Sequence, residues 1–213
     1  MKDKSLDRDI EFIYEMGCLR FMQRTWVRFL NPGFQNNSEH AFRVAWIALI
    51  IARRENVTNI EKVLLMALAH DITESRTGDI DYLSRQYVER NEVQGIEDMI
   101  AGTDLGPELI ELWKEYELRE SIEAKVVKDA DYLDIDFELA EQAARGHGAL
   151  RESKAAMRRH VSETKFATKT AKLMWDQIQS SNPHAWHANA RNRFTEGEWK
   201  PEAKTADQNT TLS

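Results

Sequence analysis

Residues 59–79, NIEKVLLMALAHDITESRTGD, determine the fold class that this sequence predicts. Asn59 is a residue type that caps helices, and apolar side chains recur at helical spacing over residues 63–69. This apolar run leads directly to the adjacent pair His70 and Asp71, and a turn-like Thr-Gly-Asp follows a few residues later. The stretch therefore predicts a buried helix that carries an imidazole and a carboxylate towards the interior.

Burying an imidazole beside a carboxylate is costly without partners, and a metal cation removes that cost by taking nitrogen and oxygen donors directly. A second predicted helix, over residues 39–55, can be capped by Ser38 and has His40 in its first turn. Asp131 poses the same burial problem in a long predicted helix over residues 120–145. Each of these residues alone is more often structural. Their joint order, His, His-Asp and Asp on three helices, predicts one ion held within a helical bundle.

The rest of the chain also predicts helices, because it has only 9 glycines and 4 prolines and no sustained alternation of apolar and polar residues. We expect an all-α protein with further helices over residues 9–29, 81–100, 108–116 and 154–179. Residues 1–180 would form one domain, and the polar residues 181–213 a flexible tail. Most of the other aspartates of the long helix, Asp129, Asp134 and Asp136, are expected to face solvent.

Composition excludes several classes of protein. The net charge is −7 with acidic and basic residues interleaved, so no basic tract is available to grip nucleic acid. The longest apolar run, residues 45–52, is too short to span a bilayer, and the charged N-terminal stretch is unlike a signal peptide. The single cysteine, Cys18, cannot form an internal disulfide. We therefore expect a cytoplasmic protein that contacts neither nucleic acid nor membrane.

The sequence around the candidate ligands resembles the 5′-deoxynucleotidase branch of the HD-domain phosphohydrolases, over about residues 19–145. The matching motifs are Arg24-Thr25-Trp26, Ser38-Glu39-His40, His70-Asp71-x-x-Glu74, Thr77-Gly78-Asp79 and Lys128-x-Ala130-Asp131. The resemblance implies an HD-domain helical bundle with one divalent metal ion. Manganese or cobalt is expected, with iron, zinc and magnesium as alternatives. Its ligands would be His40, His70, Asp71 and Asp131.

The resemblance also implies roles for residues beside the metal. Glu74 would position or deprotonate the attacking water, with Asp71 as the catalytic metal ligand. Arg24 would bind the phosphate, or be a surface arginine. Asp79 would accept a hydrogen bond from a sugar hydroxyl, or be a turn residue. Trp26 would pack against the sugar and disfavour a 2′-hydroxyl, or be a core aromatic.

Three functions remain open from the sequence. The first is release of phosphate from deoxyribonucleoside 5′-monophosphates, the second a dNTP triphosphohydrolase or another phosphoesterase, and the third a non-catalytic nucleotide-binding regulator. The basic residues expected near the site, Arg24, Arg28, Arg43 and Arg76, do not separate the first two. A homodimer is also expected, because the helix over residues 154–179 offers apolar side chains to a partner or to the body of the protein. These are Met157, Val161, Phe166, Met174 and Trp175.

Overall fold

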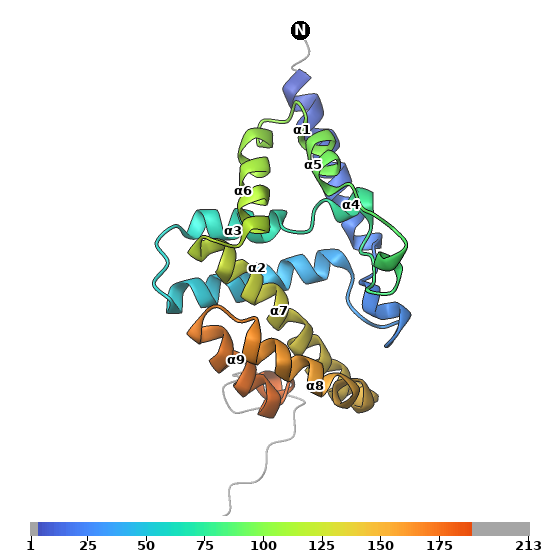
Figure 1. The fold of residues 1–213 in the computed structure, drawn as a ribbon, viewed down its shortest axis with the longest axis vertical. Coiled ribbons are helices and arrows are strands. Elements are labelled where there is room, and N and C mark those ends of the chain that lie inside the picture. The colour runs from blue at the N-terminus through green and yellow to red at the C-terminus, as the bar shows by residue number, and fades with distance from the viewer. Residues whose placement is uncertain (1–3, 189–213) are drawn as a thin grey trace, which may run out of the picture. The chain divides into compact units, whose positions relative to one another are not determined.

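A computed structural model describes residues 4–188, and within them the protein is all-α, as predicted (Figure 1). The helices are α1 (Lys4–Cys18), α2 (Asn37–Arg54), α3 (Ile60–Ala69), α4 (Glu74–Thr77), α5 (Glu92–Ile100), α6 (Gly106–Leu118), α7 (Ile122–Gln142), α8 (Gly148–Thr164), α9 (Lys169–Ser180) and α10 (Ala185–Ala188). Two compact units divide after Ser181, so α10 is described by itself. Most of the predicted tail lies outside the described residues, and its boundary stays a prediction.

The main core forms where α2 packs against both α3 and α7 (Figure 1). Its largest fully buried side chains include Ile51 from α2, Met66 from α3 and Leu133 from α7. These apolar residues recur at helical spacing, so each helix turns one face inward. Since the three predicted metal-binding segments belong to these three helices, the packing of the core also fixes the distances between them.

The start of α2 differs from the sequence prediction. Asn36, and not Ser38, is the N-cap: its side chain accepts a hydrogen bond from the backbone N–H of Glu39, and the Glu39 carboxylate accepts one from the backbone N–H of Asn36. This reciprocal arrangement is a capping box. It begins the helix one turn before His40 and orients the turn that carries this residue.

Replacing Asn36 with alanine should therefore destabilise the protein, because it removes the acceptor for a backbone N–H at the helix start. We expect a loss of about 1 kcal/mol, which lowers the melting temperature of a protein of this size by about 2–4 °C. Thermal unfolding followed by circular dichroism measures the shift. Ser38→Ala is the matched control and should leave the melting temperature unchanged; an equal shift in both variants would contradict the assignment of the cap.

Three predicted helices are interrupted. In the predicted helix over residues 81–100, the α-helix α5 begins only at Glu92, after a short 3₁₀ turn at Ser84–Gln86. The predicted helix over residues 9–29 ends at Cys18, and short 3₁₀ turns follow at Leu19–Phe21 and Thr25–Arg28. No residue of α1 is buried, whereas Leu19 is. Because α1 ends at Cys18, the chain can turn so that Leu19 packs in an apolar cluster with residues of α5 and α6.

The predicted C-terminal helix is broken in the same way, into α8 and α9. Thr168 caps α9, and the Asp129 carboxylate accepts hydrogen bonds from the backbone N–H groups of Ala167 and Thr168. These bonds satisfy the backbone groups that the break exposes.

The expectation that the extra aspartates of α7 face solvent is wrong. Asp129, Asp134 and Asp136 are all buried. Each has partners from another element: Thr168 for Asp129, His40 and Arg43 for Asp134, and Arg158 for Asp136. Carboxylates can be buried when such partners are present, and α7 meets them on several sides because α2, α8 and α9 all pack against it.

The apolar side chains that were candidates for a dimer contact mostly cover the body of the protein. Phe166 is buried in the main core, and Met174 and Trp175 pack against it. Met157 and Val161 line a cavity. Met157 is also exposed, so the segment keeps some apolar surface, and the homodimer stays a prediction. Among the described residues, no helix is both long and apolar enough to cross a membrane.

Candidate metal centre

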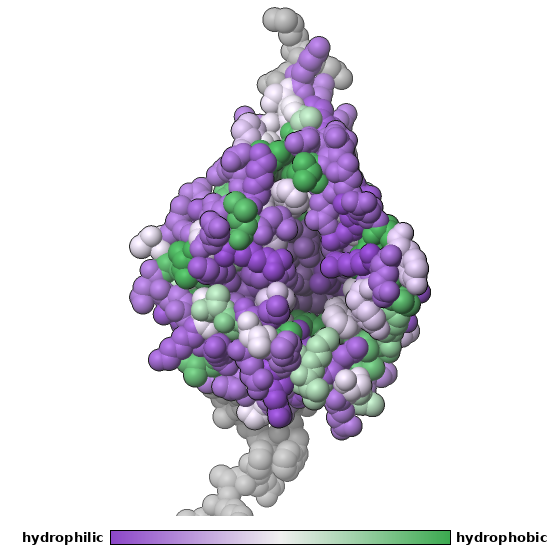
Figure 2. Space-filling model, in the orientation of Figure 1, coloured by the Kyte–Doolittle hydropathy of each residue, from purple (hydrophilic) through white to green (hydrophobic). Residues whose placement is uncertain are grey.

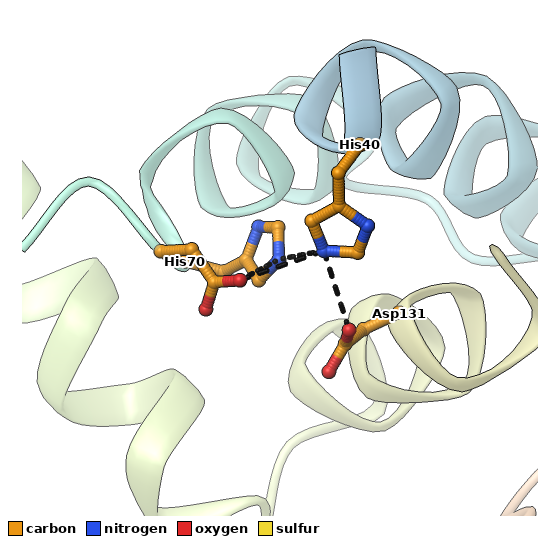
Figure 3. A group of neighbouring side chains, drawn as sticks. His40, His70 and Asp131 are labelled. Atoms are coloured by element: carbon orange, nitrogen blue, oxygen red, sulfur yellow. Dashed lines mark hydrogen bonds and ion pairs between the residues drawn. The ribbon is translucent and has the colours of Figure 1, made fainter. Parts of the chain in front are cut away.

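Four predicted ligands come together between α2, α3 and α7 (Figure 3). His40 lies in the first turn of α2, His70 and Asp71 directly follow α3, and Asp131 lies in the middle of α7. One donor atom from each lies within 4.8 Å of all the others. The two imidazoles are almost completely buried, whereas the side chains of Asp71 and Asp131 keep 26% and 15% of their surface exposed. The group therefore has a protein side and a solvent side.

The hydrogen bonds of the two imidazoles show what this group needs. The Nδ1 of His70 lies 2.7 Å from the carbonyl oxygen of Ala67, which can only accept, so Nδ1 carries the proton. The Nδ1 of His40 lies 2.6 Å from a carboxylate oxygen of Asp134. In the neutral rings, both Nε2 lone pairs then face one another across 3.3 Å.

Carboxylate oxygens of Asp71 and Asp131 each lie 3.4 Å from the Nε2 of His40. Two nitrogen lone pairs that face one another, with two carboxylates beside them, suit a cation. The mixed nitrogen and oxygen set is unlike the all-oxygen sites that calcium prefers. The residues present therefore fit a divalent metal ion.

The electrostatics of the group point the same way. Burial and Arg24 lower the pKa of His40, but the carboxylates of Asp131, Asp134 and Asp71 outweigh them and raise it well above its ordinary value. Burial raises the pKa of Asp131, but Lys128 and His40 hold it well below its ordinary value. The carboxylates thus remain ionised and attract positive charge, which a proton on His40 or a metal cation can supply.

Glu74 lies beside this group, at the start of α4. It is buried, and its Oε2 accepts a hydrogen bond of 2.7 Å from the side-chain amide of Asn37. Burial and the negative charges of Asp71 and Asp79 raise the pKa of Glu74 to about 9, while Arg24 and Arg90 partly oppose them. Without a cation this carboxyl group is protonated near neutral pH, and the positive charge of a bound divalent ion would lower its pKa so that it can accept a proton. Carboxyl groups with perturbed pKa values in a cavity are typical of proton-transfer sites.

Arg24 and Asp79 enter the same site from the two predicted motifs. The Nη1 of Arg24 lies 3.2 Å from a carboxylate oxygen of Asp71 and 3.5 Å from one of Asp79. Asp79 also accepts a hydrogen bond of 2.8 Å from the backbone N–H of Thr25. Arg24 is therefore not a surface arginine, and Asp79 holds the Arg24-Thr25-Trp26 segment against the site.

Several residues of the site had no predicted role. Lys128 donates hydrogen bonds to Asp131 at 2.7 Å and to the Tyr116 hydroxyl at 3.1 Å. Arg90 lies 3.5 Å from Glu74. Helical spacing could have indicated Lys128, which lies three residues before Asp131 on the same face of α7. Arg90 lies in an irregular segment, where sequence periodicity gives no signal.

Two adjoining cavities surround these groups. The first, of about 240 Å³, has an almost entirely polar lining that includes the predicted ligands His70, Asp71 and Asp131 with Glu74. The second, of about 420 Å³, is lined mainly by apolar and aromatic side chains: Trp26, Phe29, Ile80, Tyr82, Tyr132, Ile135, Met157 and Val161. Both are lined by Arg24, Asp79, Arg85 and Asp131. Figure 2 shows hydrophilic side chains around a hollow near the middle of the face seen in Figure 1.

A helical bundle with this His, His-Asp, Asp group defines the class of HD phosphohydrolases. The HD domain family model matches residues 16–175, so the chain belongs to the HD domain family. The crystal structure of PH0347 protein from Pyrococcus horikoshii OT3 is similar, with a TM-score of 0.61 and 27% sequence identity, covering 80% of this chain and 96% of that one.

The relatives named as 5′-deoxynucleotidases include the following three. HDDC2 from Homo sapiens is 31% identical over 138 residues, which are 62% of this chain and 67% of that protein. YBR242W from Saccharomyces cerevisiae is 32% identical over 135 residues, covering 57% of this chain and 55% of that protein. ECA3034 from Pectobacterium atrosepticum is 27% identical over 198 residues, covering 81% of this chain and 97% of that protein.

Proposed function

We propose that this protein releases phosphate from deoxyribonucleoside 5′-monophosphates. The pair of cavities carries the proposal, because a polar site that suits phosphate adjoins an apolar site that suits a base and sugar. Asp79 and Arg24 line both, at the position that the ester bond between sugar and phosphate would occupy. The names of the relatives support the same substrate class.

We assign the following roles to the site residues. His40, His70, Asp71 and Asp131 hold one divalent cation, which when bound neutralises phosphate charge and lowers the pKa of water. Glu74, oriented by Asn37, accepts or positions the proton of the attacking water.

Arg24 binds a phosphate oxygen through a charge-assisted hydrogen bond. Its Nε is a buried donor without a hydrogen-bond partner among the described residues. A phosphate oxygen would satisfy this donor, which otherwise costs about 1–3 kcal/mol.

A dNTP triphosphohydrolase is the second candidate, and one observation favours it. Besides Arg24, the polar cavity is lined by Arg85, Arg90, Arg119 and Lys128. Arg28 and Arg76, which were also expected near the site, do not line this cavity and pair with Asp81 and Glu15. Acidic side chains also line this cavity, and Arg90 and Lys128 pair with Glu92 and Asp131. A longer phosphate chain would therefore rely on Arg24, Arg85 and Arg119 together with the cation. Comparing phosphate release from dAMP with pyrophosphate or triphosphate release from dATP distinguishes the two activities.

Selection of the sugar tests the proposed activity most directly. Trp26 lines the apolar cavity together with Asp79, and its half-buried indole could fill the space beside C2′. An unpaired, buried 2′-hydroxyl costs about 1–3 kcal/mol, which corresponds to about 5- to 150-fold in kcat/KM. We expect dAMP to be hydrolysed faster than AMP by a factor in this range. Trp26→Ala should narrow the gap, mainly by improving AMP turnover.

The matched control is Tyr82→Ala, which removes an exposed aromatic side chain from the same cavity. This control should change both rates alike and leave their ratio unchanged. An unchanged dAMP:AMP ratio in Trp26→Ala would mean that Trp26 is only a packing residue beside Phe34 and Ile135. Equal rates for dAMP and AMP in the wild-type protein would contradict the deoxynucleotidase proposal but not the proposal of a metal site.

A further inference from the structure

Asp134 lies on α7 three residues beyond the predicted ligand Asp131, so the two side chains share one face of the helix. Its side chain is only 1% exposed, and its Oδ2 lies 2.6 Å from the Nδ1 of His40. Within the part of the chain that the structure describes, Asp134 lines neither the polar nor the apolar cavity of the site. It therefore contacts the site only through His40.

The carboxylate of Asp134 is itself held in a fixed orientation. Arg43, one turn after His40 on α2, donates from Nε to Oδ1 of Asp134 at 2.6 Å. The Nη2 of Arg43 donates to Glu138 and to Gln35, each at 2.7 Å. Gln35 in turn donates to the Oδ2 of Asp134. Both carboxylate oxygens are thus bound, and the carboxylate cannot turn away from His40 without breaking hydrogen bonds to charged groups.

We infer that Asp134 is a positioning residue for the metal centre. An ionised carboxylate can only accept hydrogen bonds, so it keeps the proton of neutral His40 on Nδ1 and directs the Nε2 lone pair towards the other three donors. It also fixes the plane of the ring. This inference rests on the proposed metal site, and it adds a residue that the four-ligand pattern does not contain.

The two imidazoles differ in the acceptor that holds the proton on Nδ1 and fixes the orientation of the ring. His70 donates from Nδ1 to the backbone carbonyl of Ala67 at 2.7 Å, so a side-chain substitution cannot remove its acceptor. His40 relies on the side chain of Asp134 instead. The orientation of His40 is therefore the one that mutation can change without touching a predicted ligand.

If Asp134 had a purely structural role, its substitution would lower stability without changing the affinity for metal. Asp136 is a residue for which we expect that result. Asp136 is also buried on α7 and also binds an arginine, Arg158, through both carboxylate oxygens. It contacts none of the four predicted ligands. Asp136→Asn therefore removes a similar buried charge pair on the same helix without affecting His40, and it is the matched control.

The test is titration of Co²⁺ into the metal-free full-length protein, followed by its visible absorption and by calorimetry. Loss of a carboxylate that orients a ligating histidine typically weakens metal binding about 10- to 100-fold. We expect Asp134→Asn to weaken cobalt binding by a factor in this range, because one face of the new amide donates where His40 or Arg43 also donates. Asp136→Asn should bind cobalt as the wild-type protein does, although both variants unfold at lower temperature.

Cobalt affinity in Asp134→Asn equal to that of the wild-type and Asp136→Asn proteins would overturn the inference. If Asp134→Asn does not fold, Arg43→Lys decides the matter. This variant keeps the charge of a partly exposed side chain but loses the forked contact with Asp134, Gln35 and Glu138. Weaker cobalt binding supports the positioning role, and unchanged binding overturns it. A wild-type protein that binds no cobalt would instead overturn the metal site itself.

Discussion

Asp71→Asn is expected to lower kcat/KM for dAMP by about 10³-fold or more. The substitution keeps the shape of the side chain but removes one of the carboxylates that converge with the two imidazoles. Loss of the cation removes several kcal/mol of charge stabilisation in the transition state, and each 1.36 kcal/mol is about tenfold in rate. Phosphate release in the presence of added manganese or cobalt measures the effect, and the metal content of the purified variant should fall in parallel.

Loss of activity through unfolding must be separated from loss of the metal. Asp71 keeps a quarter of its side chain exposed, so we expect Asp71→Asn to remain folded by circular dichroism. The control is Asp98→Asn on α5, an exposed aspartate bonded to Gln94, which should retain wild-type activity. Full metal-dependent activity in Asp71→Asn would remove Asp71 from the proposed ligand set.

The four converging residues were predictable because residue type and order along the chain carry the information. His70 and Asp71 follow an apolar helix that must be buried, and His40 and Asp131 lie on two further helices with apolar faces. Burial of imidazole and carboxylate groups demands a compensating partner wherever these helices meet. The structure brings all four together, although their binding of an ion remains a proposal.

The cap of α2 was missed although the sequence holds a signal for it. Asn36 and Glu39 have the spacing of a capping box, whereas Ser38 has no acidic residue three positions later. Ser38 alone satisfies the simpler rule that a hydroxyl precedes a helix. The reciprocal pair is the more specific pattern, because it satisfies two backbone N–H groups and not one.

The breaks and the buried acids could not be predicted, because they depend on contacts between distant segments. The break between α8 and α9 is stabilised by Asp129, which lies 38 and 39 residues before the two backbone groups that it accepts from. Asp134 is buried because Arg43, more than 90 residues earlier, reaches it. Sequence periodicity describes one helix at a time and carries no information on pairs of residues in different helices. It therefore predicts that an aspartate in a helix with other polar residues faces solvent.

Glu74→Gln is the prediction that separates chemistry from metal binding. The substitution preserves the size of the side chain and an acceptor for Asn37 but removes the group that can take a proton. Loss of a general base typically costs about 10²–10⁴-fold in rate, so we expect kcat for dAMP to fall at least about 100-fold. Cobalt affinity should stay near that of the wild-type protein, because Glu74 is not among the four clustered donors.

Glu55→Gln is the control for removing a carboxylate away from the site, since Glu55 accepts a hydrogen bond from the backbone of Thr170. It should keep its rate even if its melting temperature falls. Metal loss in Glu74→Gln would mean that Glu74 is a ligand, and an unchanged kcat would mean that another group receives the proton. The combination that we expect, a slow enzyme that still binds cobalt, arises only if Glu74 acts on the water or the phosphate and not on the ion.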